Sequence, residues 1–109
     1  MIDDLFENNN FLKNIIDFLV IGSVEHVKII RQKNNFDING LYDAEANKIY
    51  ISTGDNMSLY ERRITIIHEF LHYYEDVTRK DLNIDKDKTV EQRVYDRIYG
   101  GQYESKTRT

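Results

Sequence analysis

Apolar residues recur at near-helical spacing from residue 3 to residue 20, which predicts a first helix. The run from Asn8 to Asn10 interrupts the pattern and could divide this helix into two pieces. Gly22 ends the apolar pattern. Residues 24 to 31 are rich in β-branched side chains and predict a strand.

Two short segments, residues 38 to 42 and 48 to 52, flank a polar turn and predict a β-hairpin. Residues 58 to 77 then carry a broad apolar face at helical spacing, which predicts a second long helix. Ser58 and Glu61 are spaced as a capping box, so this helix is expected to begin at Ser58.

A polar, charged loop is expected from residue 78 to residue 88. Thr89 is expected to cap a last helix, with Gln92 as its reciprocal partner. The glycine pair 100–101 is expected to end that helix, and residues 103–109 are expected to form a flexible tail.

The composition is that of a single globular domain over residues 1–109, and the order of helices and strands predicts the α+β class. Hydrophobic residues make up 40% and charged residues 31% of the chain, which is ordinary for such a domain. The net charge of −4 argues against nucleic acid as a partner. No apolar run reaches membrane-spanning length and the N-terminus is acidic, so a cytoplasmic location without membrane contact is expected.

The strongest chemical signal is an HExxH pattern formed by His68, Glu69 and His72 within the second predicted helix. Residues four apart lie on one face of a helix, so the two histidines can bind one metal ion. Glu69 lies beside them, where it can act as general base on a metal-bound water. Because the chain has no cysteine, a zinc ion must be held by histidine and carboxylate groups.

A catalytic zinc ion usually has a third protein ligand. The remaining histidine, His26, precedes the motif in a predicted strand, where a structural or surface position is expected, so the third ligand is expected to be a carboxylate. Glu91 is preferred because it lies at the edge of the apolar line of the last helix, although a helix-start acid could also occupy that position. Asp76 is expected in a supporting or exposed role, because a straight helix cannot bend three turns around one ion. Three acids of the polar loop are expected to be less firmly held: Asp81, Asp85 and Asp87.

With a hairpin, an HExxH helix and a later helix that bears Glu91, residues 40–100 resemble the gluzincin metallopeptidases. In its small size the chain is similar to the minimal zincin-like proteins of bacteria and phages, of which the ImmA/IrrE family is an example. The resemblance implies a minimal zincin-like fold, zinc bound by the two motif histidines and Glu91, and Glu69 as general base. Many gluzincins carry a carboxylate four residues after the ligand glutamate, where this chain has Tyr95.

These observations predict a zinc-dependent enzyme that hydrolyses peptide bonds in a protein or peptide substrate, with one regulatory protein as a candidate target. The alternative is a non-catalytic binding protein on a zincin scaffold, such as a phage or mobile-element regulator of a host protein. A third interpretation is an enzyme that is latent until a partner activates it. The small size of the chain favours a binding protein, whereas the intact Glu69 favours an enzyme.

Other residues leave alternatives open. Residues 48–52 are expected either to pair with an extended substrate or to form an ordinary sheet strand. Arg62 and Arg63 are expected on a solvated helix face. Four side chains are candidates to stabilise an oxyanion: Tyr42, Tyr95, Tyr99 and Arg93.

Overall fold

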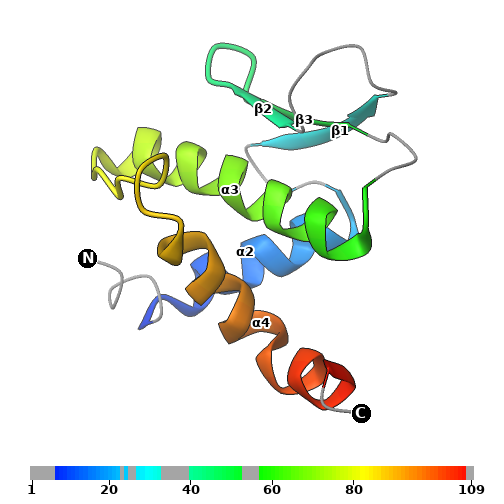
Figure 1. The fold of residues 1–109 in the computed structure, drawn as a ribbon. Coiled ribbons are helices and arrows are strands. Elements are labelled where there is room, and N and C mark those ends of the chain that lie inside the picture. Colours follow the sequence, from blue (N-terminus) through cyan, green and yellow to red (C-terminus); the bar gives the residue numbers. More distant parts are fainter. Residues whose placement is uncertain (1–6, 23, 25–26, 33–39, 53–56, 108–109) are drawn as a thin grey trace.

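The computed structural model describes residues 7–22, 24, 27–32, 40–52 and 57–107 (Figure 1). Within these residues, helices occur together with a small mixed sheet, which confirms the predicted α+β class. None of the helices described is long and apolar enough to cross a bilayer. Along the chain the elements are α2 (Asn9–Val20), β1 (Lys28–Gln32), β2 (Gly40–Asp43), β3 (Lys48–Ser52), α3 (Leu59–Thr78) and α4 (Thr89–Thr107).

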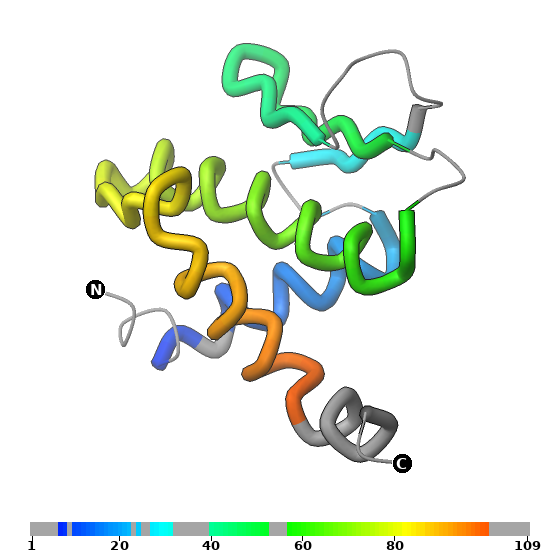
Figure 2. The backbone as a smooth tube through the Cα atoms, in the orientation of Figure 1, coloured from blue at the N-terminus to red at the C-terminus, as the bar shows by residue number. Residues whose placement is uncertain are grey.

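Helix α3 lies between the sheet on one side and helices α2 and α4 on the other (Figures 1 and 2). It therefore buries side chains over much of its circumference, which are Thr65, Ile66, Ile67, Glu69, Phe70 and Leu71. The Phe70 ring meets Phe18 of α2 edge to face, with ring centroids 4.9 Å apart. Packing on both sides fixes the position of the helix that carries the HExxH residues.

The sheet has the strand order β1-β3-β2. Strands β2 and β3 pair antiparallel, which confirms the predicted hairpin, and β1 pairs parallel to β3. The first strand covers Lys28–Gln32 and so begins later than expected. The segment Lys48–Ser52 is the central strand, bonded on both edges, so of the two alternatives expected for it the structure shows the ordinary sheet strand. The edge strand beside α3 is β2.

Local capping signals explain where the first two described helices begin. The Asn8 side chain accepts a hydrogen bond from the Phe11 backbone N–H at 3.0 Å, so the asparagine run does contain a helix boundary. At α3, Ser58 Oγ accepts from the Glu61 backbone at 3.0 Å, and Glu61 accepts from the Ser58 backbone at 3.2 Å. This is the predicted capping box.

Two predictions for α4 are wrong. The backbone N–H of Thr89 donates to Asp87 at 3.0 Å, and the Gln92 side chain bonds to Tyr60 and Asp96 instead of closing a capping box. The helix also continues through the glycine pair 100–101 to Thr107. A glycine ends a helix when it adopts a left-handed conformation; in helical conformation it costs only about 1 kcal/mol relative to alanine.

Gly40 of β2 allows the edge strand to approach α3 closely. A Cβ atom at this position would lie 2.6 Å from Thr65 Cγ2 and 3.2 Å from Glu69 Cγ. We expect Gly40→Ala to lower the free energy of unfolding by about 1–3 kcal/mol, because either the strand or the helix must shift. Urea denaturation of the variant and the parent protein measures this difference.

Thr65→Ser is the matched control, because it removes the clashing methyl group. It keeps the hydroxyl that donates to the Glu61 carbonyl oxygen at 2.6 Å. The double variant should lose less stability than the sum of the single variants, since the two positions are in contact. Strict additivity, or an unchanged stability of Gly40→Ala, would contradict this close approach.

Candidate metal centre

The two motif histidines present one ring nitrogen each to the same carboxylate oxygen. Nε2 of His68 lies 3.4 Å from Asp85 Oδ1, and Nε2 of His72 lies 3.3 Å from it. One donor atom from each of these three residues falls within 4.8 Å of the others. His68, His72 and Asp85 could therefore hold a metal ion together.

Asp85 comes from the loop between α3 and α4, and two buried side chains anchor that loop. Leu82 is 5% exposed and Ile84 is 1% exposed, although the surrounding residues are charged and polar. The Leu82 backbone N–H also donates to Glu75 Oε2 at 2.6 Å, which ties the loop to α3. The loop is thus held by the core, and the exposed Asp85 carboxylate is directed toward the histidines.

The other nitrogen of each imidazole contacts a second carboxylate. Glu91 Oε2 lies 2.8 Å from His68 Nδ1, and Glu75 Oε1 lies 3.2 Å from His72 Nδ1. An ionised carboxylate can only accept a hydrogen bond, so a proton on Nδ1 satisfies these contacts and leaves Nε2 as the nitrogen that faces Asp85. Carboxylates behind ligand histidines orient the rings in this way in many metal sites.

Glu91 was predicted as the third metal ligand, but it is not one of the three grouped donor residues. Its side chain is 8% exposed and faces the motif helix, as its position beside the apolar line of α4 indicated. The structure brings it to Nδ1 of His68, however, whereas the carboxylate beside both Nε2 atoms is Asp85. The hydrogen bond with Glu91 raises the pKa of His68, and burial of the ring opposes this shift.

Glu69 lies between α3 and β2, outside the group of three donor residues, and is 8% exposed. Burial raises the pKa of its carboxyl group, while the charges of His68 and His72 and a hydrogen bond from the Tyr42 backbone act in the opposite direction. A buried carboxylate with a raised pKa beside the two histidines has the properties of a general base.

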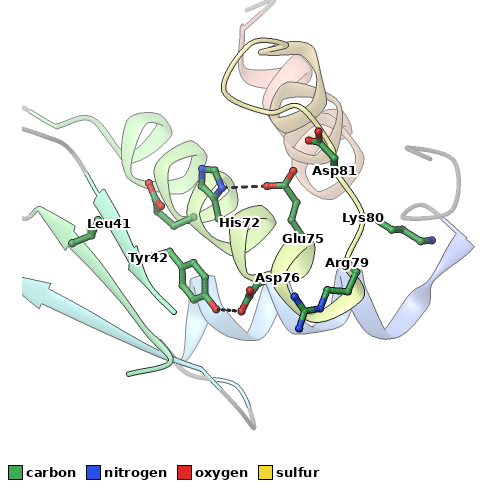
Figure 3. Close-up of a pocket in the computed structure, with 9 residues that line it drawn as sticks. Leu41, Tyr42, His72, Glu75, Asp76, Arg79, Lys80 and Asp81 are labelled. Atoms are coloured by element: carbon green, nitrogen blue, oxygen red, sulfur yellow. Dashed lines mark hydrogen bonds and ion pairs between the residues drawn. The ribbon is translucent and has the colours of Figure 1, made fainter. Parts of the chain in front are cut away.

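Two clefts adjoin the histidines, and both are bordered by Leu41, Glu69 and His72. The first has a volume of about 580 Å³ and extends along the C-terminal half of α3 (Figure 3). The second has a volume of about 460 Å³ and lies on the side of His68 and Asp85. Together they leave space on both sides of Glu69, next to the edge strand β2.

Of the four candidates for oxyanion stabilisation, only Tyr42 lines one of these two clefts. Its hydroxyl donates to the exposed Asp76 carboxylate at 3.2 Å (Figure 3). Burial and the charge of Asp76 raise the pKa of Tyr42 to about 12, so the hydroxyl keeps its proton at neutral pH. Tyr95 is fully buried in the core, and Arg93 lines a different pocket on α4.

Sequence reasoning missed two of the residues around the histidines. Asp85 was treated as one of three equivalent loop acids. The apolar residues Leu82 and Ile84 within this charged run were the available signal, because they indicate a loop anchored in the core. Glu75 follows His72 by three residues, which is a contact spacing on a helix. His26 lies outside the described residues.

No protein-family model matches the chain, and no match is found among curated proteins or solved structures.

Proposed function

We propose that this protein is a zinc-dependent peptide hydrolase whose metal is held by His68, His72 and Asp85. The observation that carries the proposal is the approach of both Nε2 atoms to Asp85 Oδ1, at 3.4 and 3.3 Å. Two imidazoles and one carboxylate form a three-ligand set typical of catalytic zinc. The carboxylates on both Nδ1 atoms support this assignment, since they leave Nε2 available.

When bound in such a site, zinc acts as a Lewis acid that polarises a carbonyl group and makes a coordinated water more acidic. Glu69 is the general base in the proposal. Its carboxylate takes a proton from the attacking water and delivers that proton to the leaving amine. The buried position of Glu69 and its raised pKa support both transfers, because the group must gain and release a proton in one cycle.

The proposed substrate is an extended peptide segment that lies along the outer edge of β2. An edge strand presents backbone donors and acceptors to a peptide in the same way that it would to another strand. The clefts on both sides of Glu69 provide space for the side chains flanking the cleaved bond. The Tyr42 hydroxyl lines the first cleft, where it would exchange its hydrogen bond to Asp76 for one to the substrate. The minimal zincin-like fold suggested by the sequence is part of this proposal.

The first test is the metal content of protein purified without a histidine tag. We expect about one zinc ion per chain by elemental analysis, and a clear loss of zinc in His68→Ala and His72→Ala. His72 and His68 are both half-buried, so circular dichroism of each variant should accompany the measurement. A protein that contains no metal and takes up none when zinc is added would contradict the proposal.

A further inference from the structure

A separate pocket lies at the other end of α3, where the end of α2 and the strands β1 and β3 meet the start of α3. It has a volume of about 270 Å³, equivalent to about nine water molecules at roughly 30 Å³ each. None of its lining residues lines the clefts at the histidines. They are Leu19, Val20, Arg31, Ile51, Ser52, Leu59, Arg62, Arg63, Ile66 and Tyr99.

Of the residues that the structure describes, three arginines and no acidic residue line this pocket, in a chain whose net charge is −4. Among the described residues, Arg31, Arg62 and Arg63 form no ion pair with a carboxylate. Glu61, adjacent in sequence to Arg62, is held by the Ser58 backbone in the capping box. Three cations that share a pocket repel one another, so an anion placed there would relieve this repulsion.

Apart from Ser52, the rest of the described pocket wall is apolar and aromatic. Ile51 and Ile66 are buried residues of the core, and Leu19 and Val20 come from the end of α2. The Arg63 guanidinium lies over the Tyr99 ring, 4.2 Å from its centroid, so one of the cations is already positioned. A ligand of matching chemistry needs both a negative group and an apolar part.

This pocket is separate from the histidine site. Arg63 precedes His72 by nine residues on the same helix, which places their backbones about 14 Å apart along the axis. Nine residues at about 100° each correspond to two and a half turns, so the two side chains leave opposite faces of α3. A ligand here would not contact the metal-binding group.

We propose that the pocket binds a small organic anion, with a phosphate or carboxylate group on Arg31, Arg62 and Arg63 and an apolar or aromatic part against Ile51 and Ile66. Arginine suits this role because its planar guanidinium donates paired hydrogen bonds to oxyanions. The volume admits a compound of about ten non-hydrogen atoms, which is the size of a small organic anion. The inference is independent of the proposed hydrolase activity.

Phenyl phosphate is the probe for this site, titrated into the intact protein by isothermal calorimetry. We expect one binding site per chain, with weaker binding of inorganic phosphate and no binding of phenol. Arg62→Gln should weaken the binding of phenyl phosphate at least about tenfold, through loss of a charge-assisted hydrogen bond. Arg62 is exposed, so its replacement is not expected to unfold the protein.

Arg97→Gln is the matched control, because it removes the same charge from an exposed position on α4 that lies outside this pocket. It should leave the affinity for phenyl phosphate unchanged. Equal weakening by both variants would show a general charge effect and overturn the proposal. Absence of phenyl phosphate binding would also overturn it, and Arg62-dependent sedimentation with anionic lipid vesicles would then assign the arginines to a membrane surface instead.

Discussion

Glu69→Gln is expected to lower the rate of peptide hydrolysis by about 10²–10⁴-fold while zinc content stays unchanged. Glutamine has the same shape as glutamate, but it cannot accept the proton of the attacking water. Glu69 does not belong to the group of residues that could hold the metal, so its replacement should leave that group intact. Removing a charge from a position that is 8% exposed is also not expected to weaken the fold.

The measurement compares initial rates of cleavage of a peptide library by the parent protein and the variant, with zinc content determined on the same samples. Glu45→Gln, an identical change at an exposed position in the hairpin turn, is the control and should keep full activity. If Glu69→Gln cleaves as fast as the parent protein, Glu69 is not the general base. If neither protein cleaves any peptide while both contain zinc, the non-catalytic binding protein becomes the better interpretation.

Asp85→Ala is expected to weaken zinc binding by more than 100-fold, and Glu91→Gln by roughly 10–100-fold, the range typical of residues that orient a ligand. The difference follows from geometry. Asp85 Oδ1 lies 3.3–3.4 Å from both Nε2 atoms, whereas Glu91 contacts Nδ1 of His68 at 2.8 Å. Competition with a chromophoric zinc chelator measures both affinities on the same scale.

Asp81→Ala controls for a general effect on the loop, because Asp81 is exposed in the same segment and lies outside the group of residues that could hold a metal ion. It should leave zinc affinity within a few-fold of the parent protein. A loss equal to that of Asp85→Ala would mean that loop conformation, and not a lost ligand, explains the effect. A larger loss in Glu91→Gln than in Asp85→Ala would return Glu91 to the ligand set that the sequence predicted.

The features that could be predicted from sequence are those whose causes lie within a few residues. The capping box of Ser58 and Glu61 spans three residues, and the spacing that brings His68 and His72 to one helix face spans four. The hairpin requires only alternation and a polar turn between its strands. Each of these signals lies within a few neighbouring residues. Together they give the order of helices and strands, from which the α+β class follows.

The helix end at the glycine pair 100–101 was predicted from an equally local signal and was wrong, because a glycine permits a helix stop without imposing one. Asn8 shows the opposite case, since its side chain supplies a specific hydrogen bond that the first turn of α2 needs. A local signal is therefore reliable where it satisfies a particular backbone group.

The sequence by itself determined the motif helix, its start, the hairpin and the presence of two imidazoles on one face. Only the tertiary structure decided which carboxylate meets which imidazole nitrogen. Asp85 comes to the Nε2 atoms because Leu82 and Ile84 fix its loop in the core. Glu91 comes to Nδ1 of His68 because α4 packs across α3. It also placed Lys48–Ser52 in the centre of the sheet, through its parallel pairing with β1. These contacts join residues far apart in the chain, and their energies depend on packing that no local pattern encodes.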